Sequence, residues 1–158
     1  MSKKILISIV VACGFFACET PKESKEKESK EIVFVCTHGA ARSPIAAAYF
    51  NKLAKENGLN YYAVFRGTEP DTSLTKETVY GLTKDGFETS NWKPEKVSDQ
   101  DVETAHKIVT FDCSIPSAKF SEMVVEWNGT PSISEDYNAA RDVIKDKVEK
   151  LIEHLKKE

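Results

Sequence analysis

The sequence lacks the patterns that mark several large classes of protein. Its four cysteines, Cys13, Cys18, Cys36 and Cys113, form no C-x-x-C pair, so no dense disulfide framework is indicated. Its 22 basic and 25 acidic residues give a net charge of -3, which leaves no positive excess for binding nucleic acid through counterion release. At 158 residues the chain is also too short for two domains that each bury a sizeable core. We therefore expect one globular domain and no nucleic-acid partner.

No apolar run in the sequence is long enough to span a membrane. The run from Ile5 to Phe16 is shorter than the ~20 residues that a helix needs to cross a hydrocarbon core of ~30 Å. It follows two lysines and precedes Ala17-Cys18, an arrangement that is similar to a bacterial lipoprotein signal. Residues 1–17 are therefore predicted to be a signal peptide, with Cys18 as the lipidation site. Cys13 is the alternative site, and an ordinary cleaved signal or a buried N-terminal helix also fits the pattern.

Residues 18–31 are predicted to be a solvated tether. After Cys18 this segment contains no apolar residue, so it has nothing to bury against the entropy of becoming ordered. The folded domain is then expected to comprise residues 32–158. The chain as a whole is acidic, so contact with a membrane is expected through the lipid rather than through a basic surface. These features predict an exported protein, lipid-anchored to a bacterial membrane on its periplasmic or surface side.

The rest of the chain alternates predicted strands with predicted helices. Residues 32–35 form a continuous apolar run, as in a strand that is buried on both faces. Ser43 as N-cap, Pro44 in the first turn and Gly58 after the last turn indicate a helix. The other predicted strands are 61–66, 107–111 and 123–127, and the other predicted helices are 74–85 and a last one with apolar positions from Ala140 to Leu155. This order predicts a three-layer α/β domain with a four-stranded parallel sheet flanked by helices, and a ligand site at the carboxyl ends of the strands.

The loop after the first strand carries the residues that suggest chemistry. Residues 36–43 read CTHGAARS, in which five residues separate a cysteine from an arginine. Five residues allow the backbone to curl so that successive N–H groups point inward around an anion, and the following helix N-terminus adds positive potential. Arg42 supplies a planar fork for a phosphate-like oxyanion. The same field favours the nucleophilic thiolate of Cys36, to which Ser43 can donate a hydrogen bond.

The segment CTHGAARSPIA, directly after the strand IVFV, resembles the phosphate-binding loop of the low-molecular-weight protein tyrosine phosphatase superfamily, which includes the thioredoxin-linked arsenate reductases. Residues 86–90 and 110–114 resemble later segments of that family, so the likeness extends over nearly the whole predicted domain. The resemblance implies the family's fold and a reaction that needs no metal ion and no organic cofactor. It implies that Cys36 attacks phosphorus. The residues that it implies for phosphate binding are Thr37, His38, Gly39, Ala40, Ala41 and Arg42.

Two positions depart from the family's pattern. Gly39 stands where the family usually has asparagine, and glycine suits the left-handed backbone that we expect there. Thr130-Pro131 stands where the phosphatases carry Asp-Pro, and a threonine hydroxyl cannot protonate a leaving oxygen near neutral pH. Asp136 is the candidate replacement for that acid, followed by Glu135. Asp112 is a further candidate site residue because it follows a strand beside the loop.

Cys113 bears on the choice between a phosphatase and a reductase. Reductases of this superfamily typically carry two thiols beyond the loop, whereas the predicted domain contains only Cys36 and Cys113. An exported protein also lacks the cytosolic thioredoxin pool. The sequence therefore predicts a phosphomonoester hydrolase that acts on phosphorylated proteins or small phosphomonoesters through a cysteinyl-phosphate. There are two alternatives. The first is an arsenate reductase, and the second is an oxyanion-binding lipoprotein with little or no turnover.

Overall fold

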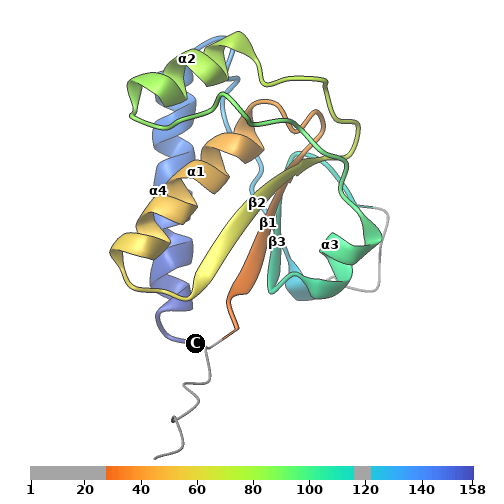
Figure 1. The fold of residues 1–158 in the computed structure, drawn as a ribbon, viewed down its shortest axis with the longest axis vertical. Helices are drawn as coiled ribbons and strands as arrows, with labels where there is room; N and C mark the ends of the chain where they lie inside the picture. The colour runs from red at the N-terminus through yellow and green to blue at the C-terminus, as the bar shows by residue number, and fades with distance from the viewer. Residues whose placement is uncertain (1–27, 116–121) are drawn as a thin grey trace, which may run out of the picture.

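The apolar run before the cysteine loop forms the central strand of the sheet, β1 (Lys30–Cys36). The computed structural model describes residues 28–115 and 122–158. In them β1 pairs in parallel with β2 (Tyr61–Gly67) on one side and with β3 (Lys107–Phe111) on the other, and β3 pairs in parallel with β4 (Val124–Glu126). The strand order is β2-β1-β3-β4, which confirms the predicted four-stranded parallel sheet (Figure 1).

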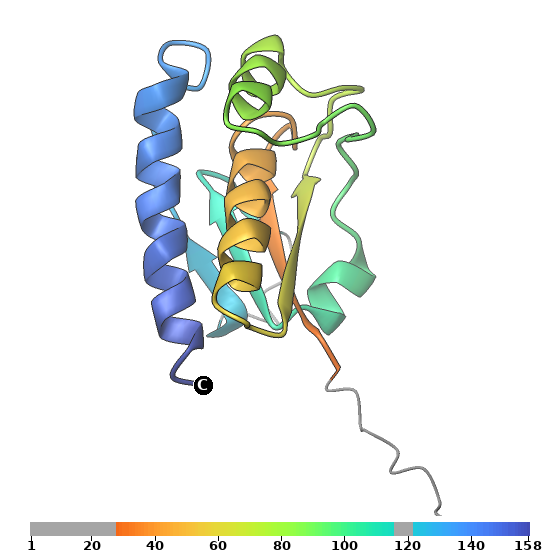
Figure 2. The same cartoon turned by 60° about the vertical axis from the view of Figure 1, so that its left-hand side comes forward.

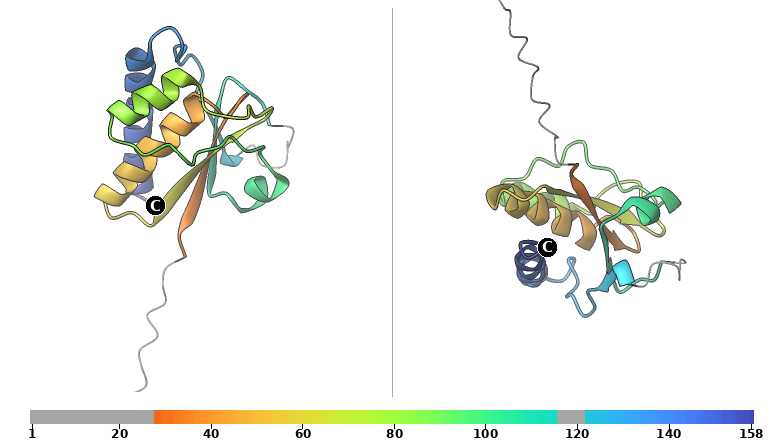
Figure 3. Two further views of the ribbon diagram at one scale, coloured as in Figure 1. Left: turned by 45° about the horizontal axis from the view of Figure 1, so that its top comes forward. Right: turned by 90° about the horizontal axis from the view of Figure 1, so that it is seen from below.

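Helices cover both faces of this sheet, which confirms the three predicted layers. α1 (Arg42–Glu56) and α4 (Tyr137–Leu155) pack together on one face. α2 (Lys76–Lys84) lies beside them, at the end of the molecule toward which the strands point (Figure 2). The short helix α3 (Asp99–Thr104) lies on the other face, as the view from below shows (Figure 3).

The alternation of side chains along β1 decides on which face the loop cysteine lies. Successive side chains of a strand point to opposite faces of the sheet. Phe34 and Cys36 belong to the large hydrophobic cluster under α1 and α4, whereas Val33 and Val35 belong to the smaller cluster under α3. Cys36 therefore lies on the α1 side of the sheet, at the carboxyl end of its central strand.

Some element boundaries differ from those predicted. β1 begins at Lys30, so it includes two residues of the predicted tether, and the Lys30 N–H donates to the Asn60 carbonyl at 3.0 Å. α2 begins at residue 76 rather than 74, because the side chain of Thr75 caps it. The predicted signal peptide, the lipidation site and the tether up to residue 27 lie outside the described residues. Within the described ranges, no helix is long and apolar enough to cross a membrane.

The sequence-based prediction missed α3, although its N-terminus carries a recognisable signal. Ser98 and Asp101 form a capping box, in which each side chain accepts a hydrogen bond from the other residue's backbone N–H. Arg66 of β2 donates to both carboxylate oxygens of Asp101, at 3.1 and 3.2 Å. Burial alone would raise the pKa of the Asp101 carboxyl, but the hydrogen bonds from Ser98 and Arg66 outweigh burial and lower it. This cluster ties α3 to the end of β2.

Candidate functional site

The loop between β1 and α1 is held in place by its carbonyl oxygens. The carbonyls of residues 36, 37, 38 and 40 accept hydrogen bonds of 2.8 to 3.3 Å from backbone N–H groups of the segment 68–75, which follows β2. In the part of the chain that the structure describes, no backbone N–H from Thr37 to Ala41 donates a hydrogen bond. The N–H and C=O of a trans peptide point in opposite directions, so the N–H groups of residues 37, 38, 39 and 41, which share peptides with these carbonyls, face the inside of the loop. We call these four groups the amide nest, and their arrangement suits an anion.

Two glycines allow the loop to lie directly against the end of β2. Gly39 has a φ of +61°, the left-handed conformation that the sequence analysis expects at this position. A Cβ on Gly39 would lie 3.0 Å from the backbone nitrogen of Gly67, and a Cβ on Gly67 would lie 2.9 Å from the backbone nitrogen of Gly39. Sequence reasoning did not single out Gly67. A glycine at the end of a strand is the signal for it, because such a glycine often marks close approach of another backbone.

Ser43 contacts the sulfur of Cys36 and is not the N-cap of α1. The N-cap position is Ala41, without a side-chain hydrogen bond, and Ser43 is buried inside the first turn. Its Oγ lies 3.1 Å from Cys36 Sγ and 3.2 Å from the Arg66 carbonyl oxygen. A hydroxyl has one proton, so Ser43 donates to the carbonyl when Cys36 is a thiol and can donate to the sulfur when Cys36 is a thiolate. This is the geometry that the predicted role of Ser43 requires.

Arg42 lies against Asp112, the residue that follows β3. Nη1 of Arg42 forms an ion pair with Oδ2 of Asp112, and Oδ1 of Asp112 accepts from the Gly129 N–H at 3.1 Å. Asp112 has a φ of 47°, which is uncommon outside glycine and recurs at functional sites. No other hydrogen bond from the Arg42 guanidinium is found within residues 28–115 and 122–158, so its remaining N–H groups can bind an oxyanion. Asp112 thus fixes the position of the guanidinium of Arg42, the residue that follows the amide nest in the chain.

Within the described part of the chain, the side chains of His38, Asp136 and Glu135 form no hydrogen bond or ion pair with Cys36, Ser43 or Arg42. The His38 side chain is 61% exposed, and its Nδ1 lies 3.5 Å from Asp71 Oδ1, so the imidazole points away from the nest. Asp136 is the N-cap of α4 and accepts a hydrogen bond from the Ala139 N–H at 3.0 Å. Neither Asp136 nor Glu135 is among the residues that line the cavity beside Arg42. The role of Asp136 as general acid stays a prediction.

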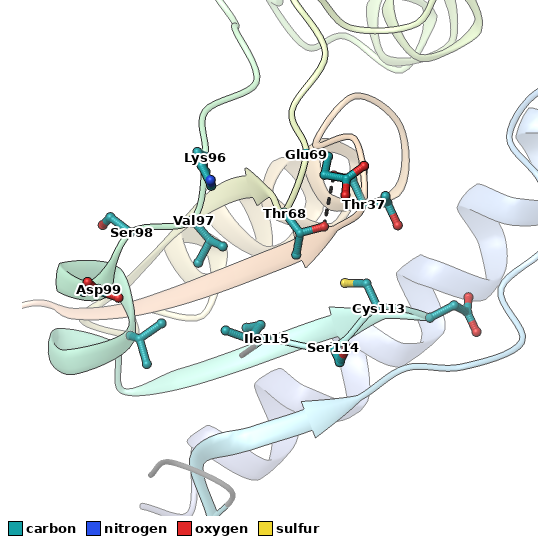
Figure 4. Close-up of a pocket in the computed structure, with 12 residues that line it drawn as sticks. Thr37, Thr68, Glu69, Lys96, Val97, Ser98, Asp99, Cys113, Ser114 and Ile115 are labelled. Atoms are coloured by element: carbon teal, nitrogen blue, oxygen red, sulfur yellow. Dashed lines mark hydrogen bonds between the residues drawn. The ribbon is translucent and has the colours of Figure 1, made fainter. Parts of the chain in front are cut away.

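Two cavities flank the loop. The cavity beside Arg42 has a volume of about 320 Å³. Its lining residues are Ala41, Arg42, Thr75, Thr130, Ser132, Ile133 and Ser134. The cavity on the α3 side is larger, about 710 Å³, and residues of the loop, of the α3 region and of the segment after β3 line it (Figure 4). No group of three His, Cys, Asp or Glu side chains suited to a metal ion is found among the described residues.

Cys113 lines the α3-side cavity, whereas Cys36 contacts Ser43 on the α1 side of the sheet. Sγ of Cys113 donates to the Val35 carbonyl at 3.5 Å, and its side chain packs against the cluster under α3. Burial raises the pKa of the Cys113 thiol, a backbone hydrogen bond at Phe111 opposes this, and the charge of a Cys36 thiolate adds to the rise. Cys113 is therefore predominantly a neutral thiol at neutral pH, which makes it a slow nucleophile.

The sequence around this site matches one protein family. Residues 31–126 match the family model of the low molecular weight phosphotyrosine protein phosphatases. The chain belongs to this family. The match begins in β1 and ends with β4, so it includes the amide nest, Arg42 and Asp112. A search of the curated proteins finds no match.

Solved structures of phosphatases and arsenate reductases share this fold. YfkJ from Bacillus subtilis aligns with a TM-score of 0.75 and 21% identity, over 84% of this chain and 98% of that one. A low molecular weight protein tyrosine phosphatase from T. tengcongensis gives a TM-score of 0.71 and 20% identity, over 80% and 99%. A thioredoxin-dependent arsenate reductase from Corynebacterium glutamicum gives 0.69 and 19%, over 83% of this chain and 64% of that one.

Substitution of Gly39 by alanine tests whether the loop needs its contact with β2. Gly39→Ala and the control Gly58→Ala both place alanine at a φ near +60°, which costs about 1–2 kcal/mol. A Cβ at Gly58 meets nothing within 4 Å, whereas a Cβ at Gly39 presses on the backbone of Gly67. We expect both variants to lose stability in urea unfolding. Only Gly39→Ala should bind phosphate more weakly by calorimetry, by about tenfold or more, since hydrogen bonds to a charged group are lost. Equal phosphate affinities in the two variants would contradict this account of the loop.

Proposed function

We propose that this member of the family is a hydrolase of phosphate monoesters that uses Cys36 as its nucleophile. The observation that carries the proposal is the amide nest, whose inward N–H groups belong to the loop that joins Cys36 to Arg42. A phosphate group in the nest would accept hydrogen bonds from these amides and from Arg42. Such donors stabilise the charge on the non-bridging oxygens during phosphoryl transfer.

In the proposed reaction the Cys36 thiolate attacks phosphorus. A sulfur–phosphorus bond forms while the bond from phosphorus to the ester oxygen breaks, and the ester oxygen leaves with the bonding electrons and takes a proton from water. Water then attacks the cysteinyl-phosphate, which releases inorganic phosphate and returns the thiolate. Ser43 stabilises sulfur as it leaves in this second step, because its hydroxyl can turn from the Arg66 carbonyl to Cys36.

The leaving group in this reaction has no obvious proton donor. No carboxylate lines the cavity beside Arg42, and threonine takes the place of the family's aspartate at residue 130. Proton transfer to a leaving oxygen typically contributes about 10² to 10⁴-fold to the rate. Esters with acidic alcohols, such as p-nitrophenyl phosphate, are therefore expected to react much faster than simple alkyl phosphates.

Arsenate reduction is the second candidate, because a solved structure with this fold is a thioredoxin-dependent arsenate reductase. That reaction needs a second thiol to attack the oxidised Cys36 adduct. Cys113 packs under α3, whereas Cys36 belongs to the cluster under α1 and α4, and the raised pKa of Cys113 keeps it protonated. These features favour hydrolysis over arsenate reduction.

The experiment that tests the proposal compares Cys36→Ser with Cys113→Ser. The Cys36→Ser variant should lose hydrolysis of p-nitrophenyl phosphate and still bind phosphate, because the amide nest and Arg42 remain. The Cys113→Ser variant should keep its activity within a few-fold. Hydrolysis by Cys36→Ser at the wild-type rate would show that the covalent mechanism is wrong. Thioredoxin-coupled arsenate reduction that disappears in Cys113→Ser would favour the reductase.

We also propose that the protein is exported and held at a bacterial membrane by a lipid on Cys18. The support is the sequence of residues 3–18, with its two lysines, apolar run and Ala-Cys pair. Cys18→Ala should therefore appear in the soluble fraction after cell lysis, while the wild-type chain sediments with membranes. Release of Cys13→Ala rather than Cys18→Ala would assign the lipid to Cys13. Membrane retention of both variants would exclude a lipid anchor at either cysteine.

A further inference from the structure

Thr130 carries a buried hydroxyl with no hydrogen-bond partner. It is the one such side-chain polar atom among the residues that the structure describes. Thr130 is 9% exposed and lines the cavity beside Arg42. A buried hydroxyl without a partner destabilises a protein relative to an apolar group of the same shape, such as the valine side chain. A ligand that completes the hydrogen bond would remove this cost.

The place of Thr130 in the chain connects it to the proposed catalytic groups. It directly follows Gly129, whose N–H donates to Asp112, and Asp112 in turn holds Arg42. Its hydroxyl oxygen is buried. Thr130 lines the cavity, and rotation about its Cα–Cβ bond gives the hydroxyl three staggered positions, of which a bound ligand can select the one that meets it.

The lining of this cavity is rich in hydroxyl groups. Apart from Arg42, its polar side chains are Thr75, Thr130, Ser132 and Ser134, and none of its lining residues is aromatic. Ser132 and Ser134 share a hydrogen bond of 2.8 Å, and Thr75 shares one of 2.8 Å with Thr78. Each hydroxyl can donate one hydrogen bond and accept two, so capacity remains for a ligand. Such a lining suits an alcohol with further hydroxyl groups better than an aromatic ring.

We propose that this cavity receives the alcohol part of the substrate, that the substrate is a polyol or sugar phosphate, and that the Thr130 hydroxyl is a specificity-determining hydrogen-bond donor to that alcohol. The inference rests on the proposed function, because the proposed function places the phosphate in the amide nest. With the phosphate there, the cavity next to Arg42 is where the ester group extends. Thr130 thus contributes to binding the alcohol and does not supply a proton, so a polyol phosphate is bound selectively but is hydrolysed more slowly than p-nitrophenyl phosphate.

Binding measurements test this proposal without requiring turnover. The three probes are glycerol 2-phosphate, phenyl phosphate and inorganic phosphate, with dissociation constants from calorimetry. The wild-type protein should bind glycerol 2-phosphate more tightly than phenyl phosphate. Thr130→Val should weaken binding of glycerol 2-phosphate by about tenfold and leave the other two within a factor of about two, while Thr130→Ser should resemble the wild type. A wild-type preference for phenyl phosphate, or an equal loss for all three probes in Thr130→Val, would overturn the proposal.

Thermal unfolding without ligand provides a second readout with a matched control. Thr78 is fully buried and Thr130 is nearly so, but the hydroxyl of Thr78 is hydrogen-bonded to Thr75. Thr78→Val should therefore lower the unfolding temperature, whereas Thr130→Val should leave it unchanged or raise it. A decrease in Thr130→Val as large as that in Thr78→Val would mean that the hydroxyl has a structural partner, which contradicts the proposal.

The two proposals can fail separately. If the probes bind as expected but Cys36 is not needed for hydrolysis, the proposed function is wrong and the specificity of the cavity stands. If hydrolysis depends on Cys36 but phenyl phosphate binds more tightly than glycerol 2-phosphate, the function stands and the cavity does not select a polyol.

Discussion

The hydrogen bonds between the loop carbonyls and the segment after β2 are the constraint on which the site depends. They turn four peptide groups of the loop so that the N–H groups of residues 37, 38, 39 and 41 face inward. Because β1 and β2 run in parallel, the loop after one strand and the segment after the other leave the sheet at the same edge. Glycines at residues 39 and 67 then permit the two backbones to touch. The proposed anion binding thus depends mainly on the backbone, and few side chains are needed for it.

A second set of contacts joins this loop to the rest of the carboxyl edge. Asp112 after β3 holds Arg42 through one oxygen and the Gly129 amide through the other. This carboxylate therefore connects the cysteine loop to the segment that contains Thr130, Ser132 and Ser134, which line the adjoining cavity. The backbone of Asp112 is left-handed, a conformation that is uncommon outside glycine and recurs at functional sites. In the proposed function, the residues after Gly129 can change the alcohol that is accepted without changing the proposed phosphate site.

The sequence predicted those parts of the molecule that depend on local pattern. The buried run of β1, the parallel sheet and the left-handed Gly39 follow from residue type and spacing, and the structure has all of them. Ser43 is a residue type that favours the N-cap position. Its side chain points inward instead, because Cys36 and the Arg66 carbonyl offer buried partners. The approach of Gly67 to the loop, and the missing partner of Thr130, depend on segments far apart in the chain. No local pattern contains that information.

The covalent intermediate is the most direct test of the account, because it requires the nest, the guanidinium and the thiolate to act on one phosphate. The wild-type protein would be quenched in acid during hydrolysis of p-nitrophenyl phosphate, digested and analysed by mass spectrometry. The account predicts a phosphoryl group on the peptide that contains Cys36, at the sulfur, and none on the same peptide from Cys36→Ser. Release of nitrophenol with no phosphorylated Cys36 at any quench time would contradict it.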